Sequence, residues 1–193
     1  QGMYPGIELP IVLGSDGAGV VVQTGSEVDR SGTNREVIID PALNWGDDQA
    51  VQSNSMTILG LPQDGTFATH VVVAASQLHD KPAHLNWQEA AALPLAGVTA
   101  YRAVFSQGGL KSGETILITG VGGGVATFAL QFAVAIGANV WVTSSSPEKI
   151  QRAIDLGAKG GFNYREDHWH KKLVKSAGSP NLIIDSAGGP GYA

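Results

Sequence analysis

An alternation of strand and helix patterns that begins near residue 110 constrains the fold of this 193-residue chain most strongly. A β-branched run, Thr115–Thr119, leads directly into a cluster of glycines. Apolar residues then recur at helical spacing as far as Ile136, and a second β-branched run follows over Asn139–Thr143. Strands that alternate with helices are typical of a parallel sheet with right-handed crossovers. The second half of the chain is therefore predicted to be α/β.

The boundaries of these elements also have sequence signals. Gly137 is expected to end the first helix, because glycine readily adopts the left-handed conformation found there. Ser146 followed by proline is typical of a helix start, and Gly157 is expected to end that helix. A later strand is predicted over Leu182–Asp185.

The first half of the chain has a different rhythm. Short apolar, β-branched runs are separated by glycine, asparagine and aspartate, which is typical of a small all-β unit with irregular loops. Strands are predicted over Ile11–Leu13, Gly19–Gln23, Glu36–Asp40 and Phe67–Val73. Residues 86–105 are expected to be helical, with interruptions at Pro94 and Gly97. We place the domain boundary between residues 90 and 91, which gives units 1–90 and 91–193.

Composition excludes several classes of function. The chain has no cysteine, so disulfides, thiolate metal sites and cysteine nucleophiles are impossible within it. A net charge of −5 gives no basic field for nucleic acid. The sequence has no window of about eighteen apolar residues, so no membrane span is predicted. The first residues form neither a basic start nor an apolar signal core, so we expect a cytoplasmic protein.

The glycine cluster is the main functional candidate. Such a loop between a strand and a helix brings backbone N–H groups close to a pyrophosphate at the helix N-terminus. The strict G-x-G-x-x-G pattern is not met, but Gly120, Gly123 and Ala126 fit the looser G-x-x-G-x-x-A. The alternative is a simple tight turn. The spacing of strand, loop, helix and second strand favours a bound dinucleotide.

The end of the second strand indicates which dinucleotide. An NAD site usually has a carboxylate about 20 residues after the glycines. Here the chain has Ser144, Ser145 and Ser146, with Lys149 one helical turn later. Hydroxyls and an ammonium suit a 2′-phosphate, so NADP(H) is favoured over NAD(H). Helix capping is the alternative role for the serines.

Several stretches together resemble the medium-chain dehydrogenase/reductase superfamily, within its zinc-independent quinone oxidoreductase-like branch. The matching stretches, besides the glycine loop, are Leu13–Val21, Asp64–Ala68, Ala90–Tyr101 and Asn163–Tyr164. The resemblance implies a partial GroES-like β domain followed by a Rossmann doubly wound parallel sheet. The chain resembles the middle of such an enzyme, without the start of the first domain and the last strands of the second.

The resemblance also implies roles for individual residues. The residues expected to bind cofactor are Thr99 beside the nicotinamide; Gly122, Gly123, Gly124 and Val125 at the pyrophosphate; and Ser145, Lys149 and Tyr164 around the 2′-phosphate, with Ser144 next to them in the serine run. The stretch from Asp185 to Gly188 is expected to border the cofactor cleft where the strands end. Strand-end packing is the alternative for Tyr164, and a hydrogen bond to its own helix is the alternative for Thr99.

Relatives that bind catalytic zinc use a histidine and a cysteine where this chain has Ser15 and Leu95. A serine hydroxyl and a leucine cannot hold zinc in a three-ligand site, so we expect no metal. His168 and His170 flank a tryptophan, but their charged surroundings favour the start of a solvated helix over a metal site.

Without a metal, the implied chemistry is hydride transfer from NADPH to an acceptor that is already electron-poor, a quinone or an α,β-unsaturated carbonyl. No general acid stands out. Asp16 is the nearest matched acidic position, and a structural role is favoured for it. The alternatives are a nucleotide-binding relative with little turnover and a zinc-dependent alcohol dehydrogenase. A small-molecule substrate and a homodimer are also implied.

Overall fold

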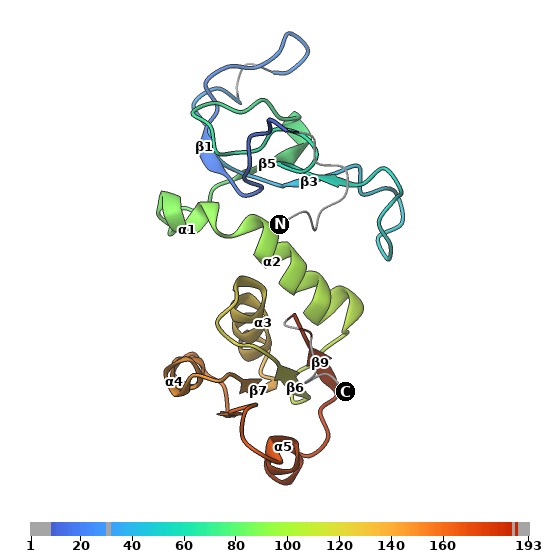
Figure 1. Cartoon of the computed structure of the whole chain (residues 1–193). Helices are drawn as coiled ribbons and strands as arrows, with labels where there is room; N and C mark the ends of the chain where they lie inside the picture. The colour runs from blue at the N-terminus through green and yellow to red at the C-terminus, as the bar shows by residue number, and fades with distance from the viewer. Residues whose placement is uncertain (1–8, 30–31, 187, 189–193) are drawn as a thin grey trace. The chain divides into compact units, whose positions relative to one another are not determined.

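The computed structural model describes residues 9–29, 32–186 and 188. Its internal contacts divide the chain into two units, Gln1–Leu95 and Ala96–Ala193 (Figure 1). The boundary predicted between residues 90 and 91 stays a prediction. None of the helices in the described ranges has the length and apolarity that a bilayer span requires.

The first unit is built from short antiparallel strands. Its three-stranded sheet has the order β1-β2-β5, and a separate hairpin pairs β3 with β4. The elements are β1 (Ala18–Val20), β2 (Glu36–Ile39), β3 (Ala42–Leu43), β4 (Thr57–Ile58), the 3₁₀ turn η2 (Ala75–Gln77), β5 (Leu78–Asp80) and the helix α1 (Trp87–Ala91).

The predictions of two strands in this unit were wrong. Residues 11–13 and 67–73 form no strand, although both have β-branched sequences. Residues 69–73 make no backbone hydrogen bond to the part of the chain that the structure describes, and Val72 is 99% exposed. A strand needs a neighbour to accept and donate its backbone hydrogen bonds, so residues 69–73, which have none among the described residues, stay irregular. The carbonyls of Val12 and Leu13 accept from the amides of Gly65 and Phe67, but these two bonds do not extend into a regular ladder.

The second unit is a parallel four-stranded sheet with helices on both faces. Its elements are the end of α2 (Pro94–Tyr101), the π-helical turn η3 (Arg102–Gln107), β6 (Thr115–Ile118), α3 (Gly124–Ala135), β7 (Asn139–Thr143), α4 (Pro147–Asp155), β8 (Gly160–Phe162), α5 (Trp169–Ala177) and β9 (Leu182–Ile184). The strand order is β8-β7-β6-β9, and α3 and α5 lie on opposite faces (Figure 1). The order therefore reverses between β6 and β9, which is the switch point where ligands of such sheets bind.

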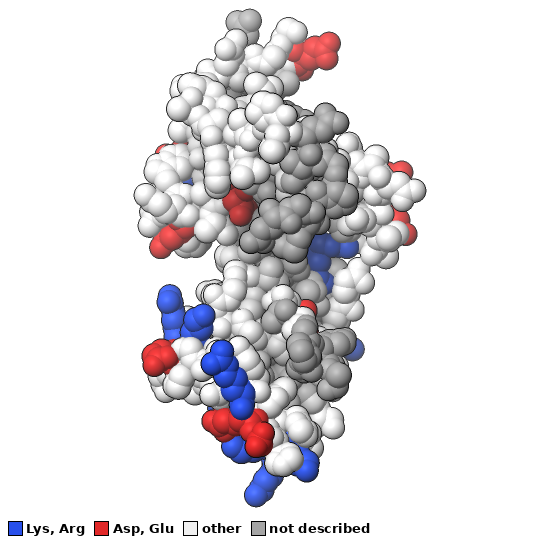
Figure 2. Space-filling model, viewed as in Figure 1, with Lys and Arg blue, Asp and Glu red and all other residues white. Residues whose placement is uncertain are grey.

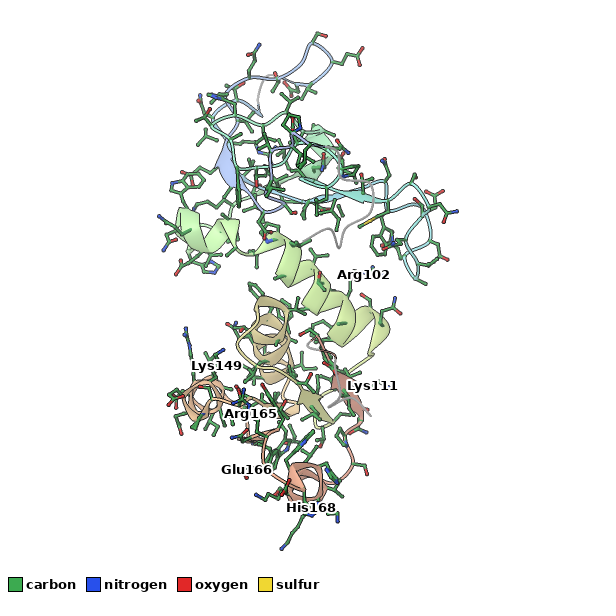
Figure 3. All side chains as sticks on the ribbon, viewed as in Figure 1. Arg102, Lys111, Lys149, Arg165, Glu166 and His168 are labelled. Carbon is green, nitrogen blue, oxygen red and sulfur yellow. The ribbon has the colours of Figure 1, made fainter. Side chains whose placement is uncertain are left out.

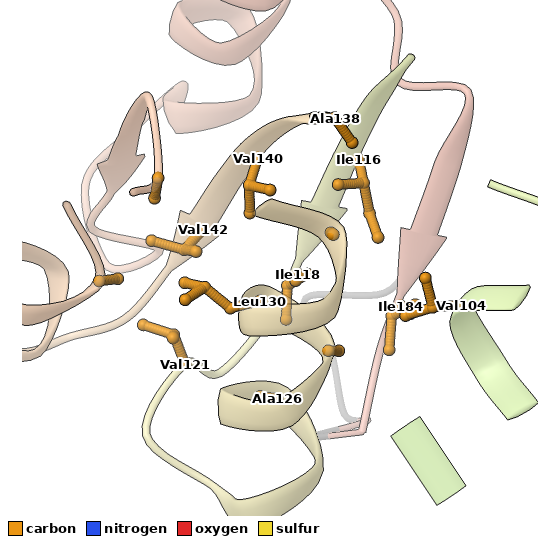
Figure 4. Packing of buried hydrophobic residues seen from close by; sticks show 14 of the residues in the cluster. Val104, Ile116, Ile118, Val121, Ala126, Leu130, Ala138, Val140, Val142 and Ile184 are labelled. Carbon is orange, nitrogen blue, oxygen red and sulfur yellow. The ribbon is translucent and has the colours of Figure 1, made fainter. Parts of the chain in front are cut away.

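Small side chains on α3 bring the helix close to the sheet. Ala126, Ala129 and Ala133 are fully buried, and Leu130 fills the remaining space. They belong to the cluster of buried residues that covers one face of β6, β7 and β9 (Figure 4): Ile116, Ile118, Val140, Val142 and Ile184. Close packing of this cluster fixes the glycine loop, because the loop joins β6 directly to α3.

The predicted helix ends in this unit are confirmed. Gly137 and Gly157 follow α3 and α4 with φ of 80° and 108°. Ser146 is the N-cap of α4, with proline in the first turn. The predicted interruption at Gly97 was wrong, because Gly97 lies inside α2 and only Pro94 marks a break, between α1 and α2.

Candidate cofactor site

The glycine loop is anchored on the end of β7. Val121 is buried, and its amide donates to the carbonyl of Thr143 at 2.9 Å. The Gly120 amide donates to the side-chain Oγ1 of the same threonine at 3.2 Å. Gly122 then adopts a φ of 117°, which only glycine tolerates well. Two hydrogen bonds therefore hold the start of the loop, and its turn requires glycine at position 122.

The N-terminus of α3 is open to an anion. Gly123 is its N-cap residue, and no side chain caps the helix there. The first backbone N–H groups of a helix have no partner within the helix, and they carry the positive end of its dipole. A Cβ placed on Gly123 would meet nothing within 4 Å. The backbone donors and the open space fit a pyrophosphate.

Lys149 belongs to a different helix, and its side chain lies next to this loop. It stands in the first turn of α4 and its side chain is exposed (Figure 3). A Cβ placed on Gly122 would lie 3.0 Å from its Cδ, 3.3 Å from its Cε and 3.5 Å from its Nζ. The structure thus brings together two predicted residues that are far apart in the sequence. Their arrangement places a cation at the rim of the glycine loop.

The serines after β7 have different partners. Ser144 is buried, and its hydroxyl accepts from the amide of Ser146 at 3.2 Å. The Ser146 hydroxyl accepts from the Lys149 amide at 3.2 Å and donates to Glu148 Oε2 at 2.5 Å. The half-buried Ser145 side chain makes no hydrogen bond to the described residues. Capping was the alternative role for these serines, and Ser146 performs it.

Glu148 is the carboxylate nearest to these serines in sequence. The hydrogen bond from the Ser146 hydroxyl, with a backbone N–H, lowers the pKa of the Glu148 carboxyl below its ordinary value. Its negative charge is thus directed onto the N-cap of α4, where it also interacts favourably with the helix dipole.

Tyr164 follows β8, beside the serines. The amide of Ser144 donates to the carbonyl of Phe162 at 3.1 Å, so the ends of β7 and β8 lie side by side. Tyr164 is 45% exposed, and Arg165 comes next in the turn. Arg165 was not among the predicted residues, although a cation directly after a strand end is a signal that sequence can supply. Figure 3 labels Arg165 and Lys149, and Figure 2 shows several basic side chains over α4 and α5.

Thr99 and Gly188 come from other elements of the second unit, α2 and the segment after β9. Thr99 is on the exposed side of α2. Ala96, one turn earlier on the same helix, has its Cβ 3.3 Å from the position of a Cβ on Gly124, so α2 passes close to the start of α3. Gly188 follows β9 with a φ of 63°. The assignment of all ten predicted cofactor residues to cofactor atoms stays a prediction.

The first unit contains a cavity of about 460 Å³ that includes none of these residues. It is lined by β1 and residues 68–73, mostly valines and glycines, and His70 is its one titratable lining residue. Such a lining supplies no converging acid–base groups, so the glycine loop remains the better candidate site. In the same unit, Asp16 Oδ1 accepts from the Leu95 amide at 2.7 Å, which makes Asp16 a cap for α2.

Comparison with known proteins agrees with both units. Residues 1–83 match the family described as alcohol dehydrogenase GroES-like domain, and residues 124–192 match the family described as zinc-binding dehydrogenase. The zinc-type alcohol dehydrogenase-like protein YogA of Leptosphaeria maculans is 40% identical, over 98% of this chain and 57% of that protein. The chain belongs to the medium-chain dehydrogenase/reductase superfamily. The predicted fold class, a partial GroES-like domain followed by a Rossmann-type parallel sheet, is confirmed.

Other members of this superfamily share the same fold and differ in their named activities. The quinone oxidoreductase of Pseudomonas aeruginosa is 31% identical, over 97% of this chain and 52% of that protein. A solved structure described as an NAD-dependent alcohol dehydrogenase superposes with a TM-score of 0.88 at 35% identity, over 94% of this chain and 55% of that one. The present chain therefore spans about half the length of the relatives it matches.

Proposed function

We propose that the full-length protein is an NADPH-dependent oxidoreductase that transfers hydride to a quinone or an α,β-unsaturated carbonyl without a catalytic metal. The position of Lys149 across Gly122 carries the proposal, because it puts a cation where the glycine loop and the end of β7 meet. Named relatives support the reaction class, among them the quinone oxidoreductase and a 2-methylene-furan-3-one reductase of Solanum lycopersicum.

The residues fit a phosphorylated dinucleotide. The open N-terminus of α3 would hold the pyrophosphate through backbone N–H groups. Ser145, Lys149 and Tyr164 would surround the 2′-phosphate, and Arg165 adds a second cation at the end of β8. The nearest carboxylate in sequence, Glu148, is held by the Ser146 hydroxyl. The chain has serines where an NAD site usually has its carboxylate, and a carboxylate at that position would repel a 2′-phosphate.

The protein's own contribution to the reaction would be orientation and exclusion of water. When bound, the cofactor would supply a hydride to the electron-poor carbon of the acceptor. Ser15 and Leu95 stand where zinc-dependent relatives have metal ligands, and neither side chain replaces an imidazole or a thiolate. Asp16 caps α2 through the Leu95 amide, which favours a structural role over proton transfer.

Steady turnover tests the reaction class. The full-length protein should oxidise NADPH when a small quinone or enone is added, and removal of metal by a chelator should leave the rate unchanged. Turnover of simple alcohols that is lost with the chelator would indicate a zinc-dependent alcohol dehydrogenase instead. Tight NADPH binding without turnover of any acceptor would indicate a nucleotide-binding relative. A homodimer and a cytoplasmic location complete the proposal.

A further inference from the structure

One carboxylate oxygen joins the two loops that leave the sheet at its switch point. The Thr119 amide donates to the carbonyl of Ile184 at 3.0 Å, so the pairing of β6 with β9 extends to the ends of both strands. The Thr119 hydroxyl donates to Asp185 Oδ1 at 2.7 Å. The same oxygen accepts from the Gly188 amide at 2.9 Å. Thr119, directly before the glycine loop, and Gly188, after β9, are therefore linked through a single atom.

This link lies at a particular place relative to the proposed cofactor. The residues proposed for the 2′-phosphate follow β7 and β8, on one side of β6. Asp185 and Gly188 follow β9, on the other side of β6. A dinucleotide spans the crevice at the switch point of a doubly wound sheet. Its adenosine half is then assigned to the β7 side, so its nicotinamide half must extend toward the β9 side.

We infer that Thr119 and Asp185 are positioning residues for the nicotinamide half of the dinucleotide, an inference that rests on the proposed function. Asp185 acts through Gly188, whose amide donates to Oδ1 and whose φ of 63° lies in the left-handed region that favours glycine. Thr119 holds the same carboxylate oxygen at the end of β6, directly before the glycine loop. Hydrogen bonds to a charged acceptor are stronger than neutral ones, and this one is partly shielded from water.

Two ligands separate positioning from general structural damage. Adenosine 2′,5′-bisphosphate reports only the adenosine half, whereas NADPH reports both halves and its fluorescence reports the nicotinamide ring. In the full-length protein, Thr119→Val removes the hydroxyl but keeps the side-chain shape. We expect it to weaken NADPH binding about tenfold, the loss of one such hydrogen bond, and to reduce the fluorescence change of the bound ring. The bisphosphate affinity should stay within about twofold of the parent value.

Two further variants test the same contact. Thr119→Ser keeps the hydroxyl and should restore most of the NADPH affinity. Asp185→Asn keeps an acceptor oxygen without the charge and should give an intermediate loss, which provides a second measurement if Thr119→Val does not fold. Equal weakening of both ligands, or no change in either, would overturn the inference. If the parent protein binds neither NADPH nor the bisphosphate, the proposed function is overturned instead, and this inference with it.

Discussion

At the scale of single residues, the position of the Lys149 side chain depends on the absence of a side chain at Gly122. The left-handed backbone of Gly122 turns the loop, and its missing side chain leaves the space that the Lys149 methylenes occupy. The sequence predicts a cofactor role for both residues, because glycine loops and serine–lysine strand ends have known patterns, and this role stays a prediction. The sequence could not predict that one lies on the other, since that contact depends on how α4 packs beside the loop.

A methyl group on Gly122 should therefore strain the backbone of the loop and crowd the Lys149 side chain. Gly122→Ala forces an alanine into a φ of 117° and puts its Cβ 3.0 Å from Lys149 Cδ. We expect the free energy of unfolding to fall by about 1–3 kcal/mol. Gly19→Ala is the matched control, because a Cβ there meets nothing within 4 Å. Chemical denaturation of both variants measures the effect, and equal stabilities would contradict it.

The lowered pKa of Glu148 gives a pH dependence. A carboxyl whose pKa is lower in the folded state stabilises the fold above its unfolded-state pKa, and this contribution is lost as the pH falls through the folded-state value. The difference in unfolding free energy between the parent and Glu148→Gln should therefore be present at neutral pH and disappear in acid. A difference that is constant between neutral and acidic pH would show that the Ser146 hydroxyl does not lower this pKa.

At the scale of elements, parallel βαβ units were predictable and isolated strands were not. The sequence over 115–143 contains both strands, the loop and the helix, so each of these elements packs against one that is close in sequence.

Residues 67–73 have an equally strong strand preference, but their pairing depends on residues that are distant in sequence, and no strand forms. The contact between Thr119 and Asp185 was also not predictable, because it requires the strand order. The π-helical turn η3 at the end of the helix expected over residues 86–105 was not predicted.

The cap of α2 is another contact between residues that are distant in sequence. Variants of Asp16 can distinguish a structural role for this residue from a catalytic one. Asp16→Ala removes the acceptor of the Leu95 amide and should lower the free energy of unfolding by about 0.5–2 kcal/mol. Asp16→Asn keeps an acceptor and should retain most of the stability and the turnover rate. Denaturation curves and steady-state rates of the two variants check this. Lost turnover with unchanged stability in Asp16→Asn would instead make Asp16 a proton donor.

At the scale of the whole molecule, the account depends on one choice of cofactor. The fold admits either nicotinamide dinucleotide, and a structural neighbour is described as NAD-dependent. Only the residues after β7 and β8 argue for the 2′-phosphate. Lys111 is a suitable control for them, because it precedes the amino end of β6, whereas the glycine loop follows the carboxyl end of that strand. Both Lys111 and Lys149 are labelled in Figure 3.

An equilibrium fluorescence titration of the full-length protein with NADPH and with NADH tests this choice most directly. We predict that NADPH binds at least about tenfold more tightly, because a charge-assisted phosphate contact contributes about 1.5–3 kcal/mol. Lys149→Ala should remove most of the difference, and Lys111→Ala should leave it unchanged. Equal or tighter binding of NADH, or equal weakening of both cofactors by Lys149→Ala, would contradict the proposed 2′-phosphate site.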